Sequence, residues 1–297
     1  MSEPPRPPDA TEVFEANRHH LFGVAYRMLG SVAEAEDAVQ EAWLRWSAAE
    51  WEGVRNPRGW LTTVVGRLAL DRLRSAQHRR ETYVGPWLPE PLVRLDDDPA
   101  DHAELADTLS LAFLTMLERL DPVERAAFLL REVFGHGYDE VARTVDRSET
   151  ACRQIVHRAK ERLDPDRPVR FDPGPDEERR LVDSFLAAAL GGDVDGLHGL
   201  LAEDVVAWSD GGPNRRAARN PIIGRDRVGI FITGIAGRRA DDLAIAHVRV
   251  NGGPGIAVTE GGAPLMVMSF QLSPTGIQSI HAVLAPEKLA GITEWPT

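Results

Sequence analysis

A strongly basic helix is predicted over residues 55–83 of a chain whose formal net charge is −12. Asn56 can cap this helix and Pro57 suits its first position. Apolar residues recur at helical spacing and form one face: Leu61, Val64, Val65, Leu68 and Leu73. The other faces carry most of the charge: Arg58, Arg67, Arg72, Arg74, Arg79 and Arg80. Together with Trp60, Thr62, Thr63 and Tyr83, the arginines suit a phosphate backbone and unpaired bases. The alternative is an ordinary amphipathic helix with a solvated arginine face.

Two helices with an acidic surface precede the basic one, over residues 11–49. Gly30 separates them, and Ser31 with Glu34 forms a capping box at the start of the second helix. Acidic and polar side chains then surround Trp43: Glu34, Glu36, Asp37, Gln40 and Glu41. This surface is either simply solubilising or a docking face for a basic partner, with Trp43 as its anchor.

A helix-turn-helix is predicted over residues 138–163. It follows helical segments that begin near Leu105 and, after Asp121, continue as one helix through Val133. The first helix of the motif ends at Asp146, and Ser148 caps the second. The second helix turns Ala151, Ile155 and Ala159 inward and exposes a polar face suited to base edges and phosphates: Glu149, Thr150, Arg153, Gln154, His157 and Arg158. A helical hairpin that binds no DNA is the alternative.

Residues 84–106 lack helical periodicity. The segment is rich in proline and acidic residues and is predicted to be a linker. Trp87 and Leu88 are costly to leave in water, so we expect them to dock against another part of the chain.

The last third of the chain predicts an α+β domain. One helix is expected over residues 181–205 and another over 224–235. Short runs typical of strands complete the pattern, at residues 205–208, 243–250, 255–260, 265–272 and 277–283. A helix followed by a mostly antiparallel, curved sheet gives a cone.

Composition narrows the class of protein. The single cysteine, Cys152, excludes an intramolecular disulfide and a cysteine-based zinc site. No apolar run approaches the ~20 residues of a membrane span, and residues 1–10 read as a disordered tail without the apolar core of a signal peptide. We therefore expect a cytoplasmic protein without a membrane partner, a metal or a cofactor.

Two motifs resemble the sigma-70 family of transcription initiation factors. EAEDAVQEAWLRW followed by NPRGWLTTVVGRLALDRLRSAQHRRE resembles its region 2, and LERLDPVERAAFLLREVFGHGYDEVARTVDRSETACRQIVHRAKERL resembles its region 4. The short spacing between them is similar to that of the extracytoplasmic-function subgroup. The resemblance implies two all-α domains, a polymerase partner contacted at its clamp helices and flap, and promoter DNA.

The resemblance also assigns roles to particular residues. Contacts with the clamp helices of core RNA polymerase would come from Glu36, Asp37, Gln40, Glu41 and Trp43. The −10 element would be read by Arg58, Trp60, Thr63, Arg67, Asp71 and Arg74. The −35 element would be read by Arg147, Ser148, Glu149, Thr150, Arg153, Gln154, His157 and Arg158. Arg67 stands where many members have asparagine.

The C-terminal third resembles a SnoaL-like domain, of the nuclear-transport-factor-2 type. FLAAALGGDVDGLHGLLAEDVVAWSDGG carries this likeness, together with WLPEP in the linker and PEKL near the end. The resemblance implies regulation through contacts between domains, carried here by Trp87, Leu88, Pro89, Asp210, Gly211, Gly212 and Lys288.

The predicted layout has six parts. They are a tail (1–10), a region 2 domain (11–83), a linker (84–106), a region 4 domain (107–165), a second linker (166–175) and a SnoaL-like regulatory domain (176–297). We interpret the chain as an alternative sigma factor modulated by its own C-terminal domain.

Two other functions stay open at this point. One is a helix-turn-helix regulator that acts without polymerase. The other is a cyclase or isomerase, in which Trp208, Asp210, His247 and His281 would line an apolar pocket. We favour a non-enzymatic domain, because no spacing marks an acid–base pair. An unidentified small ligand for this domain stays open.

Overall fold

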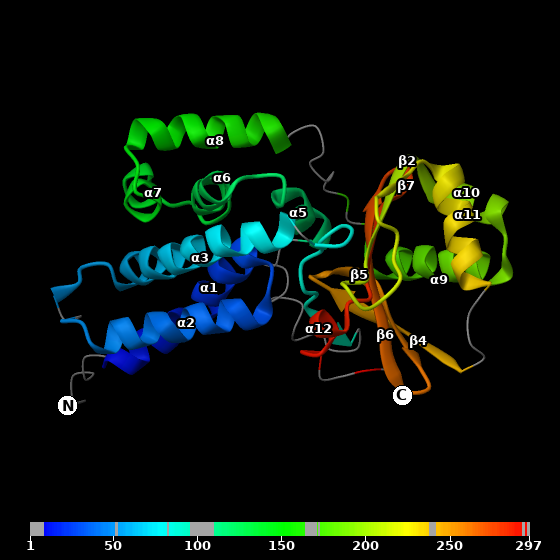
Figure 1. The fold of residues 1–297 in the computed structure, drawn as a ribbon, viewed down its shortest axis with the longest axis horizontal. Coiled ribbons are helices and arrows are strands. Elements are labelled where there is room, and N and C mark those ends of the chain that lie inside the picture. Colours follow the sequence, from blue (N-terminus) through cyan, green and yellow to red (C-terminus); the bar gives the residue numbers. More distant parts are fainter. Residues whose placement is uncertain are drawn as a thin grey trace, which may run out of the picture. The chain divides into compact units, whose positions relative to one another are not determined.

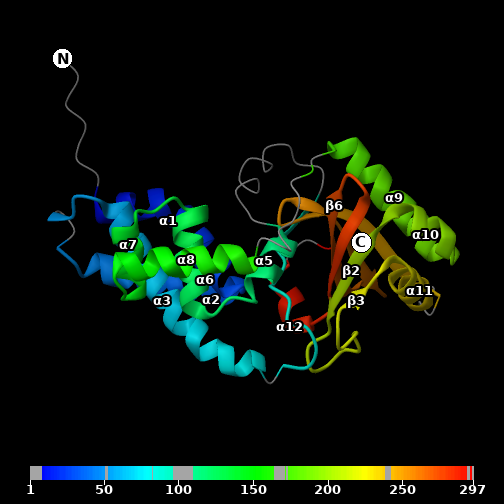
Figure 2. The same cartoon turned by 90° about the horizontal axis from the view of Figure 1, so that it is seen from above.

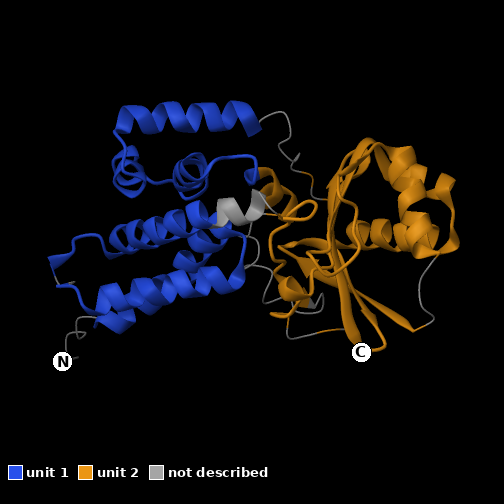
Figure 3. Cartoon of the chain, viewed as in Figure 1, with its two compact units in different colours: residues 1–81, 117–165 blue, residues 82–116, 166–297 orange. Residues whose placement is uncertain are grey.

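The chain divides into two units (Figure 3). Unit 1 comprises residues 1–81 and 117–165, and unit 2 comprises residues 82–116 and 166–297. The structure, a computed structural model, describes residues 9–50, 53–81, 83–95, 110–163, 171, 173–237, 242–292 and 295. The predicted N-terminal tail, the acidic residues 96–104 and most of the second linker lie outside this range.

Unit 1 begins with three helices (Figure 1). They are α1 (Ala10–Leu29), α2 (Val32–Ser47) and α3 (Pro57–Glu81). Gly30 ends α1 with a left-handed φ of 67°, and the Ser31 side chain accepts from the Glu34 amide at the start of α2. The Asn56 side chain accepts from the Gly59 amide at 3.0 Å, as expected for a cap of the basic helix. The apolar face of α3 packs on α1, α2, α6 and α7.

The second part of unit 1 contains the predicted helix-turn-helix. Its elements are α6 (Pro122–Phe128), the π-helix η3 (Leu129–Val133), α7 (Tyr138–Val145) and α8 (Glu149–Leu163). Asp146, at a φ of 55°, ends α7, and the Ser148 hydroxyl accepts from the Ala151 amide. The expectation of one regular helix through Val133 is wrong in detail, because its last turn widens into a π-helix, in which the Phe134 amide bonds to the Leu129 carbonyl.

Unit 2 contains helices and one mixed sheet (Figure 2). The helices are α5 (Leu111–Leu117, at the border with unit 1), α9 (Pro175–Gly191), α10 (Val194–Leu200), α11 (Arg225–Ala236) and α12 (Pro286–Leu289). The strands are β1 (Val93–Leu95), β2 (Leu201–Asp210), β3 (Ile222–Ile223), β4 (Leu243–Val250), β5 (Gly253–Glu260), β6 (Ala263–Ser273) and β7 (Gly276–Val283). Their order is β1-β4-β5-β6-β7-β2-β3, and only β2 and β7 pair in parallel.

One predicted helix of unit 2 is in fact two helices and the start of a strand. The expected helix over residues 181–205 breaks at Gly192, which has a φ of 71°, and Asp193 caps α10 by accepting from the Gly196 amide. From Leu201 the chain is already β2. In the first residues of β2, apolar and polar side chains alternate less clearly than in the other strands. The sequence pattern therefore predicted helix for residues that are strand.

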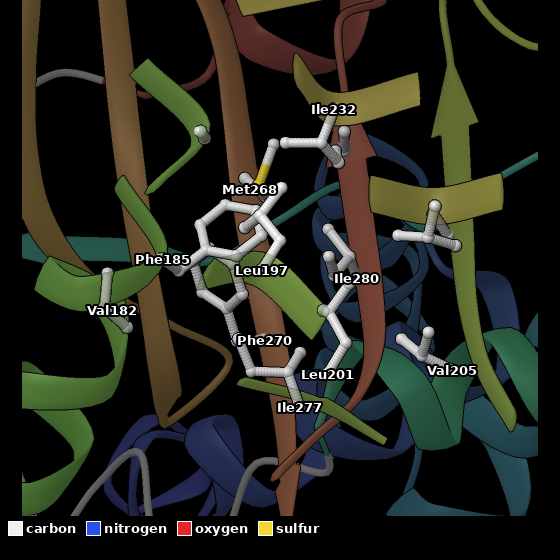
Figure 4. Close-up of a cluster of buried hydrophobic side chains, with 14 of the residues drawn as sticks. Val182, Phe185, Leu197, Leu201, Val205, Ile232, Met268, Phe270, Ile277 and Ile280 are labelled. Atoms are coloured by element: carbon white, nitrogen blue, oxygen red, sulfur yellow. The ribbon is translucent and has the colours of Figure 1, made fainter. Parts of the chain in front are cut away.

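The core of the cone lies between the helices and one face of the sheet (Figure 4). Side chains from α9, α10 and α11 meet those of β6 and β7, among them Phe185, Leu197, Ile232, Met268, Phe270 and Ile280. The rings of Phe185 and Phe270 meet edge to face, with centroids 5.1 Å apart. Each large buried side chain contributes about 1.5–3 kcal/mol to folding.

The predicted linker is partly built into this domain. β1 extends the sheet by pairing antiparallel with β4, with Val93 opposite Val250. Leu88 is fully buried in a second apolar cluster, on Val248, Val267 and Val283. The expectation that Leu88 docks is therefore met, and the surface that receives it belongs to the C-terminal sheet.

The core of unit 2 gives a stability prediction. Phe185→Ala should lower the unfolding free energy by about 3–5 kcal/mol, because it leaves a cavity against Phe270. Hydrogen exchange of the β6 and β7 amides measures this loss. Ile230→Ala is the control, since Ile230 lies in α11 with 64% of its surface exposed and should change stability by less than about 0.5 kcal/mol. Equal effects of the two changes would contradict this description of the core.

Candidate nucleic-acid interface and linker anchor

The polar face of α8 is open to solvent. Cys152, Ile155 and Ala159 are buried against the rest of unit 1, which turns the opposite side of the helix outward. Every residue predicted to read the −35 element is exposed: Arg147, Ser148, Glu149, Thr150, Arg153, Gln154, His157 and Arg158. Such a face can offer arginine forks and an amide to base edges in a major groove.

The residues predicted to read the −10 element are largely engaged inside unit 1. Arg58 donates to His20 Nδ1, and His20 Nε2 lies 3.1 Å from the Thr62 hydroxyl, which itself donates to the Arg58 carbonyl. Burial, and secondarily the Arg58 guanidinium, lowers the pKa of His20 to about 4. Because Nδ1 accepts from Arg58, these hydrogen bonds assign His20 as a neutral imidazole with its proton on Nε2.

The remaining members of this predicted site differ in their exposure. Trp60 packs beside the buried Trp46, with ring centroids 5.2 Å apart. The Thr63 hydroxyl donates to the Gly59 carbonyl of its own helix. Asp71 and Arg74 are exposed and lie 3.5 Å apart as a surface pair. Surface pairs of this kind leave both groups available to a ligand.

Helix α7 lies directly on the part of α3 that carries Arg67. The Arg67 guanidinium donates two hydrogen bonds to the Arg143 carbonyl, at 2.6 and 3.1 Å. This carbonyl belongs to the last turn of α7, whose oxygens have no partner within the helix and carry partial negative charge. A Cβ atom at Gly66 would lie only 2.7 Å from Thr144 Cγ2, so the close approach requires glycine there. Sequence analysis missed this contact.

A buried arginine ties the two halves of unit 1 together. Arg125 of α6 donates to the Leu117 carbonyl, the Met28 carbonyl and the Glu118 carboxylate, at 3.1, 3.0 and 2.6 Å. Its guanidinium thus satisfies a carbonyl at the C-terminal end of α1. Because a buried charge needs such partners, the residues before α6 and the end of α1 are held in one arrangement.

The acidic face of α2 is present as predicted. Glu36, Asp37 and Gln40 are exposed, and Glu36 forms a surface pair with Arg18 at 3.3 Å. Glu41 pairs with Arg45 at 2.7 Å and with Arg72 at 3.4 Å. Trp43 is half-buried against Phe14, with centroids 5.1 Å apart. Sequence analysis missed Leu44, which lies one turn after Gln40 with 60% of its surface exposed. Residues four apart lie on the same face of a helix, so the spacing from Gln40 could have placed Leu44 on this face from the sequence.

Asp210 forms the centre of a buried site in unit 2. Its carboxylate accepts from the Tyr83 hydroxyl at 2.7 Å, the Leu88 amide at 2.8 Å, the Gly212 amide at 2.9 Å and Lys288 Nζ at 2.7 Å. Asp210 is 1% exposed. Burial, followed by the hydrogen bond to Asp210, raises the pKa of Tyr83 and keeps its hydroxyl a donor.

Lys288 completes this site, which we call the linker anchor (Tyr83, Trp87, Leu88, Asp210 and Lys288). Its ammonium also donates to the Leu88 carbonyl, and it lies 4.0 Å from the ring centroid of Trp87 and 5.1 Å from that of Tyr83. The buried Lys288 ammonium thus lies against two aromatic rings and also pairs with the Asp210 carboxylate. The expectation that Tyr83 stacks on bases is wrong, because its ring and hydroxyl are both used here.

The other residues predicted for this site shape its backbone. Pro89 is buried beside the anchor. At Gly211 a Cβ atom would lie 2.4 Å from the Arg215 carbonyl oxygen, and Gly212 has a φ of 59°. Glycine at both positions lets the chain turn sharply enough to present the Gly212 amide to Asp210.

Comparisons with known proteins agree with this geometry. Family models for sigma-70 region 2 and sigma-70 region 4 match residues 13–79 and 110–163. The chain is 43% identical over 291 residues to the ECF RNA polymerase sigma factor SigJ of Mycobacterium tuberculosis (strain ATCC 25618 / H37Rv), across 94% of this chain and 92% of SigJ. The chain belongs to the extracytoplasmic-function sigma factors. M. tuberculosis SigI is another relative of this sigma factor, 34% identical over 278 residues and 93% of each chain.

The fold of the sigma factor is shared with a solved structure. The crystal structure of M. tuberculosis extracytoplasmic function sigma factor SigJ matches with a TM-score of 0.75 and 34% identity, over 96% of this chain and 99% of that chain. The predicted fold class is thereby confirmed for the helical region 2 and region 4 domains and for the α+β domain that follows them. As a sigma factor, the protein has core RNA polymerase and promoter DNA as its partners.

As a sigma factor, the chain belongs to a family that acts in transcription and not in catalysis. Asp210, the carboxylate that could have served as a base, accepts from Tyr83, Leu88, Gly212 and Lys288. His281 is buried in parallel with the Trp208 ring, and burial lowers its pKa to about 3. His247 pairs with Asp183 at 2.7 Å. The four candidates for an enzymatic site, Trp208, Asp210, His247 and His281, form no acid–base pair with one another.

Among the residues that the structure describes, no group of three or more His, Cys, Asp or Glu side chains could hold a metal ion. No helix in the same part of the chain is both long and apolar enough to cross a membrane.

The linker anchor yields a second prediction. Lys288→Met should destabilise the anchor by about 3–5 kcal/mol, because it leaves the buried Asp210 carboxylate without its cation. The Leu88 amide should then exchange its hydrogen faster, as measured by hydrogen exchange with mass spectrometry. Replacing both partners, with Asp210→Leu and Lys288→Met, should restore part of the loss, since apolar replacements leave no unpaired charge. Unchanged exchange in Lys288→Met would refute the anchor.

Proposed function

We propose that this sigma factor directs polymerase to promoters through three separate surfaces. The face of α2, with Glu36, Asp37 and Gln40, docks on the clamp helices of core polymerase, while the region 4 domain contacts the flap. Helix α3 reads the −10 element, and α8 reads the −35 element. The exposed polar face of α8 and the family membership support the last assignment.

The observation that carries the regulatory part of this proposal is the contact between α3 and α7. Arg67 lies in the helix assigned to the −10 element, and its guanidinium is bound to the Arg143 carbonyl. DNA cannot use Arg67 while α7 holds it. We therefore interpret the arrangement of unit 1 as a closed form, in which α8 is open to duplex DNA and α3 is covered.

The C-terminal cone acts on this equilibrium through the chain itself. Tyr83 follows α3 almost directly, and the anchor and β1 hold residues 83–95 on the cone. After β1 the chain returns to the apolar cluster that buries Leu88 through Leu111 of α5, and the rest of the region 4 segment follows directly after α5. The cone thereby limits the separations that the two DNA-reading domains can adopt on polymerase, in place of a separate regulator.

A small ligand is not part of this proposal. Asp210, the buried carboxylate of the cone, is committed to Tyr83, Leu88 and Lys288. The cone therefore acts as a scaffold for the linker.

Charge reversal on α2 tests polymerase docking. The double variant Glu36→Lys/Asp37→Lys should lose co-purification with core polymerase by more than tenfold, because it places like charges on a docking face. Asp176→Lys/Glu177→Lys is the matched control, since both residues are exposed on α9 of unit 2. If the α2 variant still co-purifies at the wild-type level, this face is not the docking site.

A reversible crosslink tests the closed form. The variant carries Gly66→Cys and Thr144→Cys in a Cys152→Ala background. A Cβ atom added at residue 66 would lie 2.7 Å from Thr144 Cγ2, so the two thiols are close enough to form a disulfide. The oxidised protein should direct little transcription from a promoter that the reduced protein uses, and reductant should restore activity. The reduced double variant controls for the substitutions, and Thr144→Cys alone controls for the effect of the oxidant. Full activity of the oxidised, crosslinked protein would show that α3 need not leave α7.

A further inference from the structure

One aromatic ring at the start of α7 lies beside two guanidinium groups. Tyr138 is the first residue of α7, and the Cζ atoms of Arg131 and Arg153 are each 4.7 Å from the centroid of its ring. A guanidinium over an aromatic face at this distance is attracted by the quadrupole of the ring. Arg131 comes from η3 and Arg153 from α8, so the ring joins the elements on either side of α7.

The backbone around Tyr138 is fixed on both sides. The Arg131 guanidinium donates to the His136 carbonyl at 2.9 Å, which closes the turn between η3 and α7. The Val141 amide donates to the Gly137 carbonyl at 3.0 Å and starts the hydrogen bonding of α7. The π-helix sets where Arg131 stands in this turn, and π-helical turns occur often at functional sites. Tyr138 is therefore a fixed platform.

Arg153, by contrast, stands on an open surface. Its side chain is 55% exposed and pairs with the Glu149 carboxylate one turn earlier, at 3.0 Å. An exposed arginine loses much rotamer freedom when it binds, so a contact that already restricts it favours binding.

The two contacts of Arg153 differ in what they leave free. The Glu149 carboxylate occupies guanidinium donors that a phosphate or a guanine would need. A guanidinium that stacks on an aromatic face keeps its in-plane N–H groups free, so the contact with the Tyr138 ring leaves these donors available. The aromatic contact can therefore persist while Arg153 binds DNA, and the ion pair cannot persist in full.

We propose that Tyr138 is a positioning residue for Arg153 in recognition of the −35 element. This inference rests on the proposed role of α8. Tyr138 holds the guanidinium plane over its ring, directs the donors away from unit 1 and reduces the freedom that Arg153 loses on DNA. The phenol hydroxyl has no part in this role.

The test uses full-length protein with core polymerase and a duplex carrying the upstream element, selected from random DNA by the wild-type holoenzyme. Tyr138→Leu should weaken binding about two- to fivefold, the loss expected for one exposed cation–π contact. Tyr138→Phe keeps the ring and should bind like wild type. Melting temperatures of both variants check that the fold is retained.

A double-mutant cycle separates positioning from a general packing role. Tyr138→Leu should cause no further loss in an Arg153→Ala background. Both single changes should relax preference at the same base pair or, where Arg153 contacts a phosphate, weaken binding to all sequences alike. Additive losses, or a Tyr138→Phe variant as weak as Tyr138→Leu, would overturn the positioning role. If Arg153→Ala itself leaves binding unchanged, the assignment of Arg153 to the upstream element fails instead.

Discussion

A buried carboxylate, Asp210, determines how the linker and the C-terminal domain are joined. A charge at 1% exposure is tolerated only with a counter-ion and a full set of donors. The donors come from a turn of the cone, from the linker and from the last helix, through Gly212, Tyr83, Leu88 and Lys288. The linker segment therefore cannot leave the cone without removing two of the four donors to this buried carboxylate, the Tyr83 hydroxyl and the Leu88 amide. Strand β1 adds backbone pairing to the same attachment. What the sequence presents as a connection between two DNA-reading domains is in the structure a part of the third domain.

The helical unit depends on a different kind of constraint, a close approach between helices. Gly66 lets α3 and α7 come together, and Arg67 then satisfies a carbonyl at the end of α7. The two predicted DNA-reading surfaces are consequently unequal: α8 is exposed, and α3 is engaged within its own unit. The same α7 carries Tyr138, beside Arg153 of α8. A short helix thus contacts both predicted reading elements, α3 through Arg67 and α8 through the Tyr138 ring.

Several elements could be predicted from local sequence because their causes are local. Ser31, Asn56 and Ser148 cap helices through bonds to amides three residues on, and the strands of the cone follow from apolar runs bounded by turns. The π-helical turn and the break at Gly192 were missed, since each replaces one helical hydrogen-bond pattern by another without changing the apolar periodicity. The strand β1 was missed for a different reason. It has three residues, and its partner Val250 is far along the chain, so no local pattern marks the pairing.

The sequence by itself determined which side chains carry charge, which faces are apolar, and the order of the sigma-70 motifs and the cone. Those features depend on residue type and spacing, which local reading captures. Only the tertiary structure decided which of the charged groups are available. Arg67, Asp210 and Lys288 read alike as polar candidates for function, yet the first is bound to a helix end and the other two are buried together. Availability depends on contacts between residues far apart in the chain, because burial and hydrogen-bond partners are properties of the packed molecule.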